Sequence, residues 1–343
     1  MLLRSALTSK QSSSVFVNRY RDLDPSIRAE CVHSIGLWFK KYPGHFLDGT
    51  YLRYVGWVLS DANTHVRLEA VKALSGVYEI SEYIGSLQTF TERFKPRLVE
   101  MATRDTELAV RVTVIGVLGA IDAHQLLEDE QREELCMLVF DEEAKVRKAV
   151  SAFVRGVWAE TVEEQLAGRK AGKQERIRAG IKALGKLLVR LAKPLGKKAI
   201  VSEEEEESID EATTAFPMSR RVREVAALVG TEQRGRIALA VEALWDDVES
   251  VSDWEALLDV LLLDHSAGTE AIHESRGRRS KSNKGSTDSA VDEVWRLEEV
   301  EETILLEVFV ASLGKARANA AAAKKVRTFS ATSQNAASHV SVG

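Results

Sequence analysis

The feature that most constrains the fold is a short motif that recurs four times in the first half of the chain. Each copy has an Asp, a Val or Ile five residues later and an Arg directly after it. The copies are Asp22–Arg28, Asp61–Arg67, Asp105–Arg111 and Asp141–Arg147, and successive arginines lie 39, 44 and 36 residues apart. A period of this length is typical of helix pairs that stack on one another in a row.

The residue types in the motif suit a helix that begins just after the Asp. A carboxylate there can accept free backbone N–H groups and faces the positive end of the helix dipole. Val66 starts an apolar stripe that continues at helical spacing through Leu74 and Val77. We expect the Arg to pair with an Asp of the neighbouring repeat. The chain is therefore predicted to be all-α, a HEAT-like α-solenoid of antiparallel helix pairs.

Further helices are expected between and after the motifs. No stretch of strand length shows a period of two. Pro96 is predicted to kink the helix that contains it. The expected helices cover 51–59, 87–101 and 128–140 in the first half, and 176–191, 219–229, 237–245, 254–263 and 291–313 in the less regular second half.

Charge and composition divide the chain into segments. Residues 168–198 hold eleven basic residues and one acidic residue, and the run Glu203–Glu207 follows. Such runs are usually solvated. The expected organisation is a flexible start (1–15), HEAT-like repeats (16–165), a basic helix (166–195), an acidic flexible linker (196–215), further helix pairs (216–265), a basic Ser-rich disordered linker (266–290), a helix (291–315) and a disordered tail (316–343).

Composition also narrows the class of protein. The net charge of −5 does not favour a binder of polyanions along the whole chain. Cys31 and Cys136 are too few for a disulfide framework, fit a reducing compartment and are expected to pack in repeat cores. No apolar run reaches 18 residues, so no membrane association is expected.

Catalytic chemistry finds little support in the sequence. The seven histidines are scattered, and there is no P-loop, no GxGxxG after a strand, no HExxH and no CxxC. We expect a protein that acts by binding and is not an enzyme. Accordingly, no catalytic residue, cofactor, metal site or small-molecule substrate is predicted.

Several segments resemble a known family. They are Phe16–Asp22, Trp38–Pro43, Tyr51–Trp57, Val66–Leu74 and Phe90–Lys95. Together they look like the stromalin conservative domain, over about 16–105, which marks the stromal-antigen subunit of cohesin. The family's proteins are longer, so the chain is interpreted as a fragment. The resemblance implies a non-enzymatic scaffold that supports sister-chromatid cohesion and chromosome segregation on chromatin in the nucleus.

The resemblance also implies partners and a site. Partners would be the kleisin subunit with the cohesin core, regulators of cohesin that carry short aromatic motifs, and duplex DNA. In the family a conserved pocket, completed by the kleisin, captures the aromatic peptides. By motif, and with Arg53 one turn before Trp57, its residues would be Tyr20, Arg21, Arg53, Trp57, Arg93 and Phe94. The alternative is that Trp57 and Phe94 are core residues of their helices.

Contact with DNA phosphates is the second expectation. No DNA-contact residue can be carried over by motif, so the candidates rest on charge alone. The alternative is a solvated helix face. Arg276–Lys284 is either a nuclear-localisation signal or a disordered linker. The candidate phosphate contacts are Lys40, Lys41, Arg169, Lys170, Lys173, Arg176, Lys182, Lys186 and Arg190.

Two other functions stay open from the sequence. One is a generic HEAT-repeat scaffold unrelated to chromatin, which a buried face of Tyr20, Trp57 and Arg93 would favour. The other is a nucleic-acid-binding accessory to an enzyme, driven by the basic block.

Overall fold

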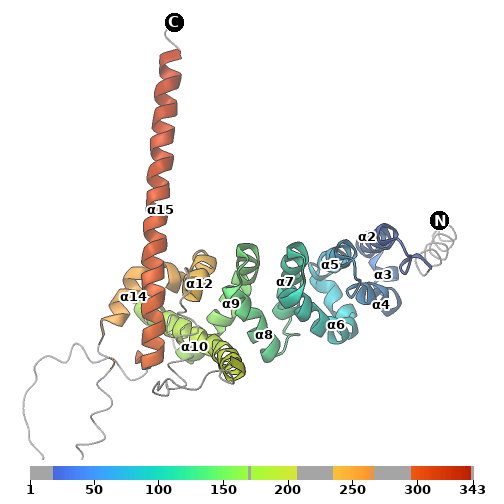
Figure 1. Ribbon diagram of the computed structural model, residues 1–343, viewed down its shortest axis with the longest axis horizontal. Coiled ribbons are helices and arrows are strands. Elements are labelled where there is room, and N and C mark those ends of the chain that lie inside the picture. Colours follow the sequence, from blue (N-terminus) through green and yellow to red (C-terminus); the bar gives the residue numbers. More distant parts are fainter. Residues whose placement is uncertain (1–17, 169–170, 207–234, 264, 266–294, 341–343) are drawn as a thin grey trace, which may run out of the picture. The chain divides into compact units, whose positions relative to one another are not determined.

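The computed structural model describes residues 18–168, 171–206, 235–263, 265 and 295–340. The chain divides into two compact units, Met1–Phe153 and Val154–Gly343, with the division inside helix α9 (Figure 1). Every described element is a helix and none is a strand. The prediction of an all-α fold is thereby confirmed for the described part of the chain.

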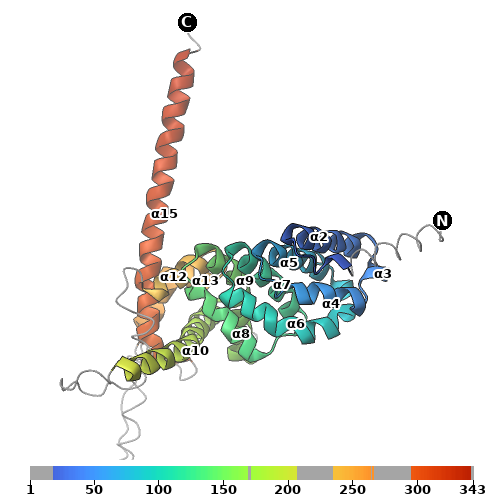
Figure 2. The same ribbon diagram turned by 45° about the vertical axis from the view of Figure 1, so that its right-hand side comes forward.

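The first unit consists of two rows of helices. Helices α2, α5 and α7 pack side by side, and α4, α6 and α8 form the second row (Figures 1 and 2). The expected second helices of the repeats are confirmed, and Pro96 lies inside one of them. The elements are α2 (Pro25–Lys41), α3 (Pro43–Phe46), α4 (Gly49–Val58), α5 (Thr64–Tyr78), η1 (Ser81–Tyr83), α6 (Ile84–Arg104), α7 (Leu108–Ala123), α8 (Asp129–Cys136), η2 (Met137–Phe140) and the first part of α9 (Ala144–Leu166).

The apolar stripes that follow the motifs form the core between these rows. On α5 the side chains of Val66, Leu74 and Val77 are buried, as the spacing predicts. Cys136 is buried and Cys31 half-buried, both as free thiols. Burial raises the pKa of the Cys31 thiol.

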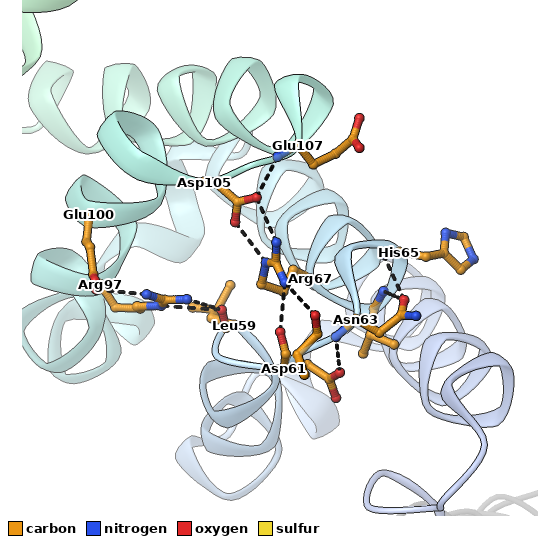
Figure 3. Close-up of polar contacts among 11 residues, drawn as sticks. Leu59, Asp61, Asn63, His65, Arg67, Arg97, Glu100, Asp105 and Glu107 are labelled. Atoms are coloured by element: carbon orange, nitrogen blue, oxygen red, sulfur yellow. Dashed lines mark hydrogen bonds and ion pairs between the residues drawn. The ribbon is translucent and has the colours of Figure 1, made fainter.

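Arginine–aspartate pairs join each motif to the next. Arg28 donates to both carboxylate oxygens of Asp61 at 2.7 and 2.8 Å. Arg67 does the same to Asp105 at 2.8 Å for both bonds (Figure 3). Arg111 in turn pairs with Asp141. The predicted pairing between neighbouring repeats is therefore confirmed; we call this series the Arg–Asp ladder.

Three of the four motif arginines also bind the turn of their own repeat, whereas Arg111 donates through Nε to the carbonyl oxygen of Ala102. Nη1 of Arg67 donates to the carbonyl oxygens of Asp61 and Ala62 at 2.9 and 3.1 Å (Figure 3). Arg28 and Arg147 make the equivalent bonds in their own turns. One guanidinium thus fixes the shape of its own turn and the distance to the next one.

The motif Asp is expected from the sequence to cap the helix that follows it. In the structure it lies two residues before the N-cap. Asn63 is the N-cap of α5, and its side chain accepts from the N–H of His65 and of Val66. The Asp61 carboxylate instead accepts the N–H of Asn63 at 2.8 Å. This local turn leaves the carboxylate open to the arginine of the preceding repeat.

The second unit is built around the last helix of the chain. Helix α15 packs on α10, α12 and α14, and Leu184 and Leu188 of α10 and Ile304 and Leu305 of α15 are buried. Among the described residues, no helix is long and apolar enough to cross a membrane. The elements are α10 (Lys173–Glu206), α12 (Arg236–Leu244), α13 (Glu249–Ser252), α14 (Trp254–Leu261) and α15 (Glu299–Val340).

Two expected irregular segments are helical where they are described. Helix α10 continues through Glu206, into the expected acidic linker, and α15 continues to Val340, through most of the expected tail. Ala and Glu are strong helix formers, so composition that looks like a linker can still extend a helix. The flexible start, the expected helix at 219–229 and the linker at 266–290 lie outside the described residues.

Removing one ladder arginine should destabilise the first unit. In Arg67→Ala the Asp105 carboxylate, whose side chain is only 3% exposed, loses its charged partner. We expect the free energy of unfolding to fall by about 3 kcal/mol or more, measured by chemical denaturation. Arg104→Ala is the matched control, because Arg104 is exposed and has no described partner. A similar loss in both variants would contradict a special role for the ladder.

The same pair should make stability depend on acid pH. Burial opposes ionisation of Asp105, but hydrogen bonds from Arg67 and from the N–H of Glu107 outweigh it and lower the pKa. The stabilisation is therefore complete above the unfolded pKa of about 4 and is lost as the pH falls through the lower folded value. The free energy of unfolding of wild type and of Arg67→Ala is measured by chemical denaturation at pH 7 and at about pH 3. The difference between the two proteins should be smaller at the lower pH. A difference that does not change with pH would contradict this.

Candidate functional site

Three aromatic rings from two segments meet at the start of the first unit. Tyr54 and Trp57 lie three residues apart on α4, and Tyr20 precedes α2. The Tyr20 ring centroid lies 4.8 Å from that of Tyr54 and 6.2 Å from that of Trp57, with the latter rings stacked. Tyr20 is only 7% exposed, whereas Trp57 is 39% exposed. The cluster therefore has a buried base and an accessible indole.

Two arginines cover this cluster without a carboxylate partner. The Arg21 guanidinium carbon lies 5.1 Å from the Tyr20 centroid and 5.6 Å from that of Trp57. The guanidinium of Arg53 lies 5.4 Å from the Tyr54 centroid and 5.6 Å from that of Trp57. Neither side chain forms an ion pair or hydrogen bond with another described residue. Cation–π contact holds both groups over the rings and leaves their N–H donors available to an anion.

Arg93 and Phe94 reach the same helix from α6. The Phe94 ring lies so close to Gly56 that a Cβ at position 56 would overlap it. Phe94 is therefore held against α4 at the residue before Trp57. Arg93 is exposed and its guanidinium lies 5.5 Å from the Phe94 centroid. Of the six predicted residues, Tyr20, Arg21, Arg53 and Trp57 thus come together around the aromatic cluster and Phe94 packs on α4, whereas Arg93 contacts only Phe94.

A surface pocket of about 370 Å³ opens beside the Trp57 indole. Tyr20, Arg21 and Trp57 line it together with the ladder pair Arg28 and Asp61. This volume accommodates one or two large side chains. Because the ladder pair is bidentate and half-buried, the wall that it forms is rigid.

Sequence reasoning missed two residues of this site. Tyr54 contacts both other rings and lies one turn before Trp57, so its i,i+3 spacing was a usable signal. Gly56 had no such signal, because its role depends on the approach of Phe94 from another helix.

The basic residues predicted to contact phosphates differ in how exposed they are. Lys40 and Lys41 are exposed in the last turn of α2, and the Lys41 ammonium lies 5.6 Å from the Tyr42 ring centroid. In the second unit Lys173, Arg176 and Lys186 are exposed and Arg190 is half-buried. Arg169 and Lys170 lie outside the described residues.

Lys182 does not present a free surface charge. It is half-buried, and burial and the neighbouring Lys186 lower its pKa. The negative charges that counteract this shift are Glu301 and Glu298, at the start of α15. Part of the basic block is therefore compensated within its own unit.

Two of the described histidines make local polar contacts. His33 Nδ1 lies 3.0 Å from a carboxylate oxygen of Glu69, and His265 contacts the backbone of Val260 and Leu297. In the described ranges, no three or more His, Cys, Asp or Glu side chains are grouped so that they could hold a metal ion.

Comparison with known proteins matches this region to a family. Residues 21–95 match the stromalin conservative domain. The chain contains a stromalin conservative domain. The match includes every predicted pocket residue except Tyr20, which directly precedes it, and the resemblance expected from the sequence is confirmed.

Relatives of the chain are named as cohesin subunits. The cohesin subunit psc3 of Schizosaccharomyces pombe is 40% identical over 45% of this chain and 16% of its own length. Cohesin subunit SA-1 of Xenopus laevis is 30% identical over 76% of this chain and 18% of its own length. The chain thus spans less than a fifth of these relatives.

A solved structure supports the fold. The cohesin subunit Scc3 from Z. rouxii matches 87% of this chain and 30% of its own chain, with a TM-score of 0.52 and 20% identity. At this identity the likeness concerns the fold alone, and it agrees with the predicted HEAT-like solenoid.

A methyl group at position 56 should disturb the stromalin domain. Gly56→Ala would push the Phe94 ring off α4, so we expect the free energy of unfolding to fall by about 1–3 kcal/mol. Gly116→Ala is the control, because no atom lies within 4 Å of a Cβ there. In that variant the better helix propensity of Ala should stabilise by about 0.5–1 kcal/mol. Thermal or chemical denaturation measures both, and equal effects would contradict the packing argument.

Proposed function

We propose that this chain is a non-enzymatic part of a cohesin subunit that supports sister-chromatid cohesion and chromosome segregation in the nucleus, on chromatin. The stromalin conservative domain and the names of the relatives support this role. The chain would act as a scaffold that holds the kleisin subunit, regulators of cohesin and DNA.

The pocket beside Trp57 would capture regulators through short peptides with aromatic residues. One observation carries this proposal: an accessible indole is flanked by Arg21 and Arg53, whose guanidinium groups have no carboxylate partner among the described residues. An aromatic side chain of the peptide would pack on the indole, and acidic residues beside it would pair with the arginines. The kleisin would complete the site.

Contact with duplex DNA is the second part of this role. Lys40 and Lys41 are exposed in the last turn of one helix, where they could neutralise phosphates without reading sequence. Lys182 is the weakest of the candidates, because its own unit already compensates its charge.

The peptide pocket can be tested by binding. A labelled Phe-x-Phe-type peptide with acidic flanks is titrated into the full chain in the presence of a kleisin fragment, and anisotropy is measured. Trp57→Ala should weaken binding by at least about tenfold, the loss typical of a central aromatic contact. Arg21→Gln should weaken it less, because the indole remains.

Arg19→Gln is the matched control for Arg21→Gln. Arg19 is also exposed, but its guanidinium already pairs with Asp22 at 2.6 Å. This variant should bind like wild type. Binding that is insensitive to Trp57→Ala, or absent in the folded wild type, would favour a generic HEAT-repeat scaffold instead.

A further inference from the structure

The second unit contains a surface cavity that the proposed function does not use. Its volume is about 370 Å³, and it lies between the second part of α9, the start of α10 and the short helices α13 and α14. Trp158 and Ile177 form an apolar floor, and charged side chains stand around it. The size suits one or two large side chains of a ligand.

The floor of this cavity is fixed in place by a close contact of helices. The Trp158 indole N–H donates to the carbonyl oxygen of Gly180 at 2.9 Å. A Cβ at position 180 would lie 2.6 Å from the Ser250 Oγ and 3.1 Å from the Trp158 ring, so a larger residue there would require these side chains to shift. The half-buried indole is therefore a preorganised apolar surface, as binding anchors require.

The basic and the acidic residues that line the cavity come from different helices. Lys173 and Arg176 come from the first turns of α10, and Glu249 and Asp253 come from α13 and the N-cap of α14. None of these four side chains forms an ion pair with another described residue. Lys173 and Arg176 oppose the dipole at the start of α10, where Glu175 is the acidic residue of the first turn and accepts the N–H of Gly172. A carboxylate of a ligand would therefore find two cations there that are not paired with a described carboxylate.

We propose that this cavity is a docking site for a peptide segment of a partner protein. The segment would carry a bulky apolar side chain that packs on Trp158. On one side of it an acidic residue would pair with Lys173 and Arg176, and on the other a basic residue would pair with Glu249 and Asp253. This site is separate from the pocket beside Trp57 and does not depend on the function proposed for it.

Two labelled peptides test the proposal on the full chain by fluorescence anisotropy. Their sequences are Glu-Glu-Leu-Phe-Leu-Lys-Lys and the reverse order, so that both directions of binding are sampled. One of the two peptides should bind saturably, and Trp158→Ala should weaken the binding of this peptide at least about tenfold. Arg176→Glu should weaken it as well, and a peptide with lysines in place of the two glutamates should restore binding to this variant.

Two control variants separate this site from the rest of the chain. Arg155→Glu changes an exposed charge on α9 outside the cavity and should bind like wild type. Trp57→Ala should also bind like wild type, although it loses the aromatic peptide of the first site. The proposal is overturned if neither peptide binds the folded wild type, or if binding survives both Trp158→Ala and Arg176→Glu.

Discussion

The rest of the first unit depends on the bidentate arginine–aspartate pair between successive helix pairs. Such a pair is costly to bury unless every donor and acceptor is satisfied. In Arg67 the Nε and Nη2 groups bind the carboxylate of the next turn, and Nη1 binds carbonyls of its own turn. The ladder thus sets the spacing of the repeats. It also positions the site, because Arg28 and Asp61 line the pocket beside Trp57.

The sequence predicts this ladder because its two residues recur at a fixed spacing, but it does not predict how the carboxylate is used. An Asp is equally suited to the N-cap and to a position two residues before the N-cap, so residue type alone does not distinguish these two roles. Only the bond from the Asn63 N–H to Asp61 distinguishes them. Of the two site residues that sequence reasoning missed, Tyr54 has a usable signal in its helical spacing to Trp57. Gly56 does not, because the residue that requires it, Phe94, lies on another helix.

The second unit shows where composition misleads. The acidic run after the basic block has the charge pattern of a linker, yet α10 continues through Glu206, because glutamate is a good helix former when its neighbours allow it. Lys182 shows that the charge of a segment does not predict the surroundings of one side chain in it. Its position in a basic helix predicts a surface cation, but the acidic residues that compensate it, Glu298 and Glu301, are distant in sequence.

What distinguishes a structural arginine from a binding arginine in this chain is its partner and not its position. Arg21 and Arg28 are only seven residues apart, and both line the same pocket. Arg28 is committed to Asp61, so its charge is already neutralised. Arg21 is held only by the faces of Tyr20 and Trp57, which fix its place but leave its donors unused. At the second cavity Lys173 and Arg176 are exposed and also form no ion pair with another described residue, but no aromatic ring holds them in place. The feature common to both proposed binding sites is therefore an accessible indole in a pocket whose cations lack a carboxylate partner among the described residues.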